Sequence, residues 1–230
     1  MAAAREKNYL PPFIMQLIID NKNYSSWSLR PWLLLRHFNI EFDEIRIPLF
    51  TDEFETTLKK YTDAGKVPVL IDDKTTVWDS LAICEYISEQ YLQGKGYPLD
   101  TAARAECRSA SAEMHSSFFQ IREYMPMNCR AQRSITITED MAVEIQRIDQ
   151  LWQNLRSKYQ HQGEWLFGEF SIADCMYAPM ASRFHSYQPE LSAVSRDYIS
   201  SLMSHPQLKT WYRQSAIETE VITQSEVGQQ

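Results

Sequence analysis

Residues 66–91 read KVPVLIDDKTTVWDSLAICEYISEQY and hold two short apolar runs followed by a segment of helical length. The runs, at 67–71 and 75–78, are separated by the polar residues DDK. That spacing is typical of a β-hairpin, so we expect the two strands to be antiparallel. A helix is expected from about Ser80 to Tyr91. The stretch therefore predicts a β-β-α unit.

The chain before this hairpin has a different order of elements. The continuous apolar run at 13–19 is typical of a strand buried on both faces, and residues 41–50 alternate like a second strand. Helices are expected over LRPWLLLRHF and over TDEFETTLKKY, where apolar residues recur at helical spacing. This order implies parallel strands joined by helical crossovers. Residues 13–92 therefore predict a β-α-β-α-β-β-α domain with a mixed sheet.

The rest of the chain predicts an all-helical domain. Residues 93–99 contain two glycines and a proline and are the expected linker. Beyond it no strand pattern is convincing, and an apolar stripe at spacings of three and four runs through Met141, Ile145, Ile148, Trp152, Leu155 and Tyr159. The fold class is thus α/β followed by an all-α domain over 100–218, with one helix from 101 to about 124. Residues 1–8 and 219–230 are expected to be flexible tails.

Composition and charge exclude several classes of protein. The 230 residues include 23 Lys and Arg against 30 Asp and Glu, a net charge of −7 without a basic run. This balance argues against nucleic-acid binding and against an anionic membrane surface. The four cysteines form no CxxC pair, and the five histidines form no HExxH motif. We expect a soluble cytoplasmic protein without a disulfide framework or a metal.

A serine-rich loop precedes the first expected helix. Tyr24 is followed by Ser25, Ser26, Trp27 and Ser28. Hydroxyls here lie beside the unpaired N–H groups and the positive end of a helix, where a thiolate or another anion is stabilised. The alternative is that one serine only caps the helix.

Two further features lie in the hairpin and at the start of the helix after it. A cis peptide bond between Val67 and Pro68 would leave the backbone of Val67 available to an extended ligand, although most such bonds are trans. Asp79 and Ser80 form a helix start that either is a plain cap or also holds a ligand. In the second case Ser80 would bind a carboxylate and Asp79 an ammonium group.

These features together resemble the glutathione transferase superfamily, most closely its zeta class of maleylacetoacetate isomerase-like enzymes and related bacterial serine-type members. The matching stretches are YSSWSLRPWLLL, KVPVLIDD, DSLAICEYISEQY and FSIADCMYAP, in this order. The resemblance implies a thioredoxin-like N-terminal domain, a C-terminal helical bundle, glutathione as co-substrate without a metal, and a homodimer.

The resemblance also implies roles for individual residues. A serine hydroxyl at the start of the first helix, Ser25 or Ser26, would donate a hydrogen bond to the glutathione sulfur. Val67, before the cis proline Pro68, would pair its backbone with the cysteinyl residue. The γ-glutamyl end would be held by Asp79 and Ser80, and Lys66 lies near the peptide backbone.

A pocket for the second substrate is expected between the domains. Ser111, His115 and Phe119 fall on one helical face at i, i+4 and i+8 and could line it, although ordinary packing is the alternative. The zeta class has a carboxylate-binding arginine on the matching helix. That arginine lies three residues further from the FSIADCMYAP stretch than Arg183 does. That departure puts an isomerase substrate in doubt.

The stretch FSIAD is expected to have a structural role. Ser171 as N-cap and Asp174 three residues later form a capping-box pattern. The function predicted for the whole chain is a glutathione transferase that joins the thiolate to a small electrophile, as in detoxification. The alternatives are a glutathione-dependent cis-trans isomerase and a non-catalytic module that binds glutathione or a partner.

Overall fold

The computed structural model describes residues 14–49, 51 and 54–229. The expected tail at 1–8 lies outside this part of the chain. The N-terminal domain runs through β1 (Gln16–Ile19), α1 (Ser26–His37), β2 (Asp43–Arg46), α2 (Phe54–Leu58), β3 (Val69–Asp72), β4 (Thr75–Trp78) and α3 (Ser80–Tyr91).

The four strands form one mixed sheet in the order β2-β1-β3-β4. β1 pairs with β2 in parallel, and Leu17 lies opposite Glu44. β3 pairs with β1 and β4 in antiparallel fashion, with Leu70 opposite Leu17. The predicted β-α-β and β-β-α halves and the predicted hairpin are confirmed, because the helical crossover makes the first pair parallel and the short turn makes the last pair antiparallel.

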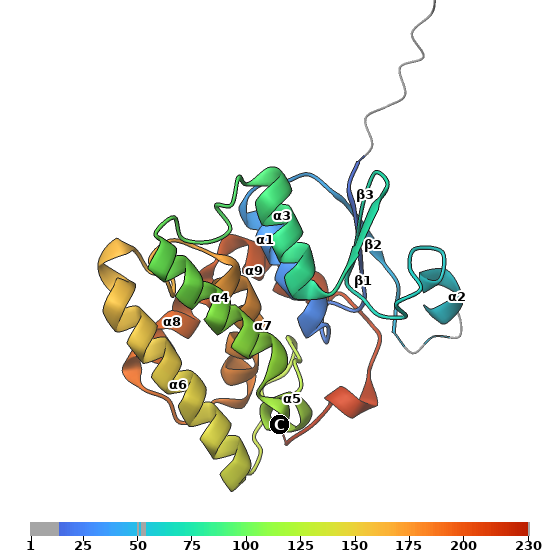
Figure 1. Cartoon of the computed structure of the whole chain (residues 1–230). Helices are drawn as coiled ribbons and strands as arrows, with labels where there is room; N and C mark the ends of the chain where they lie inside the picture. Colours follow the sequence, from blue (N-terminus) through green and yellow to red (C-terminus); the bar gives the residue numbers. More distant parts are fainter. Residues whose placement is uncertain (1–13, 50, 52–53, 230) are drawn as a thin grey trace, which may run out of the picture.

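Helices cover both faces of the sheet. α1 and α3 lie between the sheet and the helical domain, whereas α2 lies on the other side (Figure 1). Alternation along β1 explains this division: Leu17 and Ile19 belong to the large core, while Ile18 packs in a small cluster with Leu58 of α2. The larger cluster continues from the sheet through α1 and α3 into the helical domain, so the two domains share one apolar core.

The helical domain surrounds one central helix. Its elements are α4 (Thr101–Ser116), α5 (Phe119–Tyr124), α6 (Glu139–Tyr159), a 3-10 turn η1 (Gln160–Gln162), α7 (Ile172–Tyr187), α8 (Ala193–Ser204) and α9 (Pro206–Ala216). The whole stripe predicted for α6 is buried. α7 is buried on all sides except at His185, and it packs against α1, α4 and α8. None of the described helices is long and apolar enough to cross a membrane.

The single helix expected from 101 to about 124 is wrong. α4 ends at Ser116, and Phe118 adopts a left-handed conformation with φ of 65° before α5 begins. The break lets Phe118 bury its side chain in the core. It also leaves carbonyls at the end of α4 without helical partners, and Arg122 of α5 donates to those of Met114, His115 and, at 2.8 Å, Ser117.

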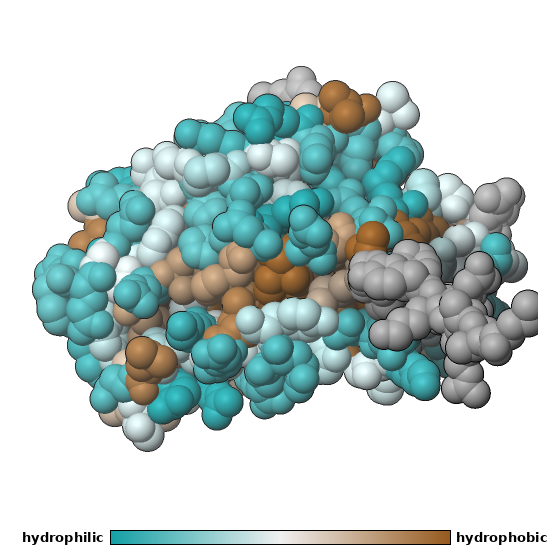
Figure 2. Space-filling view, turned by 90° about the horizontal axis from the view of Figure 1, so that it is seen from above, coloured by the Kyte–Doolittle hydropathy of each residue, from teal (hydrophilic) through white to brown (hydrophobic). Residues whose placement is uncertain are grey.

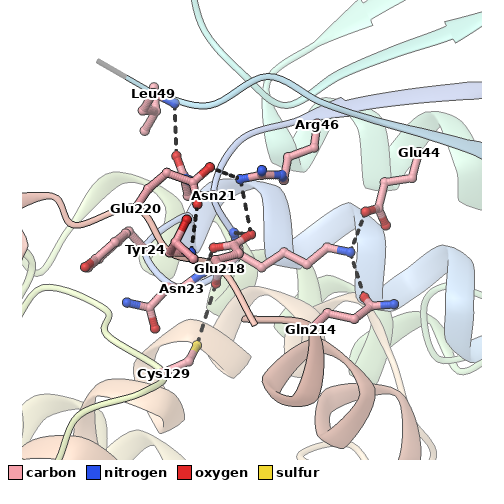
Figure 3. A network of polar contacts seen from close by, with 12 residues as sticks. Asn21, Asn23, Tyr24, Glu44, Arg46, Leu49, Cys129, Gln214, Glu218 and Glu220 are labelled. Atoms are coloured by element: carbon pink, nitrogen blue, oxygen red, sulfur yellow. Dashed lines mark hydrogen bonds and ion pairs between the residues drawn. The ribbon is translucent and has the colours of Figure 1, made fainter. Parts of the chain in front are cut away.

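The C-terminal residues cross from the helical domain to the N-terminal domain, where we expected a flexible tail. This segment, residues 218–229, includes the 3-10 turn η2 (Thr223–Ser225). The Glu218 carboxylate accepts hydrogen bonds from the backbone N–H groups of Lys22 at 2.8 Å and Asn23 at 3.1 Å. Figure 3 shows Glu218 directly against the loop between β1 and α1, with Arg46 pointing toward it. The Glu218 carboxylate thus satisfies two backbone N–H groups of the loop between β1 and α1. The amino-acid composition of the segment gave no sign of this contact.

Side chains on both domains reinforce this contact. Lys22 forms an ion pair with Glu44 and donates to Gln214 of α9 at 2.6 Å. Tyr24 donates to Glu226 at 2.6 Å.

Seen from above, the face in Figure 2 is mostly hydrophilic, with apolar surface gathered in a band across its middle.

Candidate active site

A cavity of about 700 Å³ lies where the N-terminal domain meets α4. It brings together residues from the α1 start, the segment before β3, the end of β4, the α3 start and the end of α4. Its lining consists of Trp27, Ala64, Lys66, Val67, Pro68, Trp78, Asp79, Ser80 and His115. Five residues expected to bind glutathione, at 66–68 and 79–80, therefore share one cavity.

The start of α1 lies beside this cavity. Ser25 is the N-cap: its Oγ accepts from the N–H of Ser28 at 3.3 Å and donates to the Ser28 hydroxyl at 2.8 Å. Burial raises the pKa of the nearby Asp20 carboxyl to about 7. Ser26 is buried too, and no hydrogen bond of its side chain occurs among the described residues. Neither serine is part of the cavity lining, which begins at Trp27.

The peptide bond between Val67 and Pro68 is cis. Both residues contact the cavity, and Lys66 is exposed at its edge. Because β3 begins immediately afterwards, at Val69, the sheet fixes this part of the cavity wall.

Asp79 and Ser80 begin α3. Asp79 has a φ of 78°, a backbone conformation that costs a non-glycine residue about 1–3 kcal/mol. Its Oδ1 caps α3 by accepting from the N–H groups of Leu81 at 2.9 Å and Ala82 at 3.1 Å. Its Oδ2 lies 3.1 Å from Nε2 of His115. One carboxylate oxygen of Asp79 therefore caps α3, while the other remains available to a contact outside the helix.

Trp27, Ala64 and Trp78 line the cavity but were not predicted as site residues, and of these Trp27 makes the most polar contacts. Two guanidinium groups lie over the Trp27 ring, that of Arg30 at 4.2 Å and that of Arg122 at 4.8 Å from the ring centre. His115 meets it edge-on at 5.4 Å. The i, i+3 spacing of Trp27 and Arg30 was a usable signal, since such residues share a helix face, but nothing in the sequence pointed to Arg122.

The four residues expected in the second-substrate pocket do not lie together. His115 lines the cavity, while Ser111, one turn earlier on α4, is fully buried. Phe119 is 68% exposed on α5, because the helix breaks at Phe118 and the i+8 position turns away. The shared face predicted for Phe119 is therefore wrong. Arg183 lies inside the helical domain, with 4% of its surface exposed.

The protein's own thiols are not poised to react. Cys84, Cys107 and Cys175 are buried, and burial raises the pKa of all four cysteine thiols, that of Cys107 to about 12. A thiolate at this site would have to come from a ligand. In the described part of the chain, no three His, Cys, Asp or Glu side chains are grouped to hold a metal ion.

The stretch that begins α7 is a capping box placed deep in the helical domain. The Asp174 carboxylate accepts from the N–H and hydroxyl of Ser171, at 2.9 and 3.0 Å. It also accepts from the Leu166 N–H at 3.0 Å and the Tyr198 hydroxyl at 2.9 Å. These four bonds join α7 to α8 and to the preceding loop, far from the cavity lining.

A thioredoxin-like domain with a cavity at the starts of α1 and α3, closed by a helical domain, is the fold of glutathione transferases. Two family models match the chain: the glutathione S-transferase N-terminal domain over residues 24–90 and the C-terminal domain over residues 139–214. The chain belongs to the glutathione transferase superfamily.

Relatives by sequence include zeta-class members. The chain is 25% identical to a probable maleylacetoacetate isomerase of Caenorhabditis elegans, over 79% of this chain and 88% of that protein. It is 24% identical to glutathione S-transferase Z2 of Arabidopsis thaliana, over 78% and 85% of the two chains. Among solved structures, a Burkholderia glutathione transferase homologue with bound glutathione has a TM-score of 0.69 at 19% identity, covering 89% of this chain and 99% of that one.

Proposed function

We propose that this protein is a glutathione transferase that binds glutathione in the cavity and uses a serine hydroxyl at the α1 start to stabilise its thiolate. The observation that carries the proposal is the joining of Lys66, Val67, Pro68, Asp79 and Ser80 in one cavity beside that helix start. In this arrangement Asp79 binds the ammonium and Ser80 the carboxylate of the γ-glutamyl group, and Val67 pairs with the peptide.

Electrostatics favour an ionised sulfur at this position. A free thiol has a pKa near ~8.5, so little thiolate exists at neutral pH. The first turn of α1 contains no acidic residue, so its positive end is not neutralised. Together with one hydroxyl donor, the helix end is expected to lower the thiol pKa by roughly 1–2 units. The serine stays protonated, since it acts as a donor.

Ser25 and Ser26 are both candidates for that donor. The Ser25 hydroxyl is already engaged with Ser28, which supports Ser26. Ser25→Ala should then lower the stability by about 1 kcal/mol through loss of the N-cap. Ser26→Ala should leave stability unchanged and lower turnover. Unchanged turnover in both variants would contradict a hydroxyl donor.

The reaction is proposed as addition of the thiolate to a small electrophile between the domains. A cis-trans isomerisation is the second candidate, supported by the sequence similarity to a protein named probable maleylacetoacetate isomerase. Glutathione binding without turnover would instead indicate a non-catalytic module. A homodimer is proposed from family membership and is tested by light scattering, which should give twice the mass of one chain.

Calorimetry with two thioethers tests the glutathione site. S-methylglutathione should bind, and S-methylcysteinylglycine, which lacks the γ-glutamyl group, should bind at least ~10-fold more weakly, a difference of about 1.4 kcal/mol. Asp79→Asn should abolish most of this difference. Asp73→Asn, at the exposed tip of the β3–β4 hairpin, is the control and should retain it. Equal binding of the two ligands by the unmodified protein would contradict the proposal.

A further inference from the structure

We propose that Tyr24 is a positioning residue for the serine hydroxyl that stabilises the thiolate, and that the C-terminal segment, residues 218–229, holds Tyr24 in place through Glu226. This inference rests on the proposed function, because Tyr24 directly precedes the two serines proposed as donors to the glutathione sulfur. It is drawn from a group of hydrogen bonds in which no residue of the cavity lining takes part.

The Tyr24 side chain is buried and has charged partners on its hydroxyl. The hydroxyl donates to the Glu226 carboxylate at 2.6 Å and accepts from the Arg130 guanidinium at 3.0 Å. The same guanidinium lies over the Tyr24 ring, 5.6 Å from its centre. Hydrogen bonds to ionised groups are stronger than those between neutral groups. The ring of Tyr24 is therefore fixed by groups that lie outside its own loop.

A tight turn joins Tyr24 to the serines. The N–H groups of Tyr24 and Ser25 both donate to the carbonyl of Asn21, at 3.1 and 2.9 Å. The Ser26 N–H donates in turn to the Tyr24 carbonyl at 3.0 Å, and α1 begins at Ser26. Because these bonds leave the turn little freedom, a displacement of the Tyr24 ring also displaces the backbone that orients the serine hydroxyls.

Glu226 is held by partners of its own. Its Oε1 accepts from Nδ2 of Asn128 at 3.0 Å as well as from Tyr24, and its Oε2 forms an ion pair with Arg133. Burial raises the pKa of Glu226, but these hydrogen bonds and the ion pair outweigh it and leave that pKa below its ordinary value. The carboxylate is therefore ionised at neutral pH and accepts the Tyr24 proton bond as a charged group.

The chain is anchored just beyond Glu226. Ser134 and Gln229 form an antiparallel bridge, with bonds of 2.9 and 3.0 Å from the N–H of each to the carbonyl of the other. Gly228 has a φ of 91°, and a Cβ at this position would lie 2.8 Å from the carbonyl oxygen of Ser134. Glycine satisfies both the backbone conformation and the close approach. The sequence of the C-terminal segment thus fits this one position against the helical domain.

These contacts connect the activation of glutathione to the helical domain. Glu226 and Arg130 lie outside the thioredoxin-like domain, whereas Tyr24 and the serines belong to it. Loss of the bonds to the Tyr24 hydroxyl would free the ring and loosen the turn. A hydroxyl that points less directly at the sulfur stabilises the thiolate less, because hydrogen bonds weaken as their angle departs from linear. The pKa of the bound thiol would then rise while glutathione stayed bound.

The test measures the pKa of the bound thiol, by ultraviolet titration of glutathione on the full chain. Tyr24→Phe keeps the buried ring, and Asn23 keeps its own bonds to the loop between α5 and α6, so the loop stays attached. We expect Tyr24→Phe to raise the thiol pKa by about 0.5–1 unit, a roughly 3–10-fold loss in the ionisation constant. Tyr124→Phe, whose exposed hydroxyl has no hydrogen bond within the described residues, is the matched control and should leave the pKa unchanged.

Glu226→Gln tests the role of the C-terminal segment. It should raise the thiol pKa in the same direction, and the double variant should show no larger rise than Tyr24→Phe alone, because both changes act on the same bond. Glu190→Gln, at an exposed position between α7 and α8, is the control. Binding of S-methylglutathione, which has no thiol proton, should stay within about two-fold in all of these variants.

The outcomes separate this inference from the proposed function. An unchanged thiol pKa in Tyr24→Phe would overturn the positioning role and leave the glutathione site in place. A rise in Tyr24→Phe without one in Glu226→Gln would overturn the part assigned to the C-terminal segment. If S-methylglutathione binding weakened as much as the ionisation constant, the loop would hold the whole tripeptide, which also overturns the inference. Bound glutathione without thiolate in the unmodified protein would overturn the proposed function itself.

Discussion

Nε2 of His115 lies 3.1 Å from Oδ2 of Asp79, so the last turn of α4 in the helical domain contacts the N-cap of α3 in the thioredoxin-like domain. Burial lowers the pKa of His115, although Asp79 acts in the opposite direction. The ring is therefore neutral at pH 7 and donates its Nε2 proton to the carboxylate. Through this bond the helical domain fixes the oxygen that we propose for the glutathione ammonium.

Replacing His115 by alanine should weaken glutathione binding more than it slows the reaction. The change removes the donor to Asp79 and the edge contact with Trp27. We expect the KM for glutathione to rise roughly 3–10-fold, about 1 kcal/mol, with kcat nearly unchanged. His185→Ala, at an exposed position of α7, is the control. A kcat lower by two orders of magnitude would instead make His115 a catalytic proton acceptor.

Loss of the Glu218 carboxylate should loosen the loop that carries Ser25 and Ser26. Its side chain is only 6% exposed and accepts from two backbone N–H groups of that loop. Glu218→Ala should cost about 1–3 kcal/mol in the free energy of unfolding, measured in urea, and lower turnover. Glu220→Ala, which removes the more exposed partner of Arg46, should cost less than about 0.5 kcal/mol. Similar losses in both variants would argue against a specific role for Glu218.

The capping box of α7 should affect stability alone. Ser171→Ala removes one of four donors to Asp174 and should cost about 0.5–2 kcal/mol. Asp174→Ala leaves several buried donors unpaired and should cost about 2–5 kcal/mol. Activity per folded molecule should stay unchanged in both. A variant that kept its melting temperature but lost activity would show that the box belongs to the active site.

Several elements of the fold could be predicted from the sequence because neighbouring residues determine them. The DDK turn sets the β3–β4 hairpin, the apolar stripe sets α6, and Asp79 caps α3 by the same side-chain bonds that its residue type favours. Family resemblance then located the cavity residues in the hairpin and at α3.

The missed features depend on contacts between distant segments. Phe119 does not share a face with Ser111 and His115, because the helix breaks where Phe118 is buried. Helical periodicity does not reveal such a break. The Arg122 guanidinium, from α5, lies over the ring of Trp27 in α1, and Glu218 meets Lys22, which is 196 residues earlier in the chain. Such pairs need tertiary packing, so composition and spacing contained no signal for them.

A histidine pair at the domain boundary should make the protein sensitive to acid. Nδ1 of His37 lies 2.9 Å from Nε2 of His205, and the Gln207 N–H donates to Nδ1 of His205 at 3.2 Å. The proton of His205 is therefore on Nε2 and points at His37. Burial, and then the proximity of His205, lowers the pKa of His37 to about 4.

As the pH falls, His37 is therefore protonated at a higher pH in the unfolded chain than in the folded protein. Stability should fall as the pH drops from about 6.5 toward about 4, since the folded pKa is depressed. Urea unfolding at pH 7 and pH 5 measures this loss. His37→Asn, which keeps an acceptor near the Nδ1 position, should reduce it, whereas His161→Asn at an exposed position should not. An unchanged pH dependence in His37→Asn would contradict the assignment.

Ultraviolet titration of bound glutathione examines the sulfur itself. The thiolate absorbs where the thiol does not, so difference spectra of the glutathione complex against pH report the pKa of the bound thiol. We predict a pKa of about 6.5–7.5, hence thiolate at neutral pH, and a shift back toward ~8.5 in Ser26→Ala or Ser25→Ala. Glutathione that binds but shows no thiolate at pH 7 would contradict a glutathione-activating enzyme.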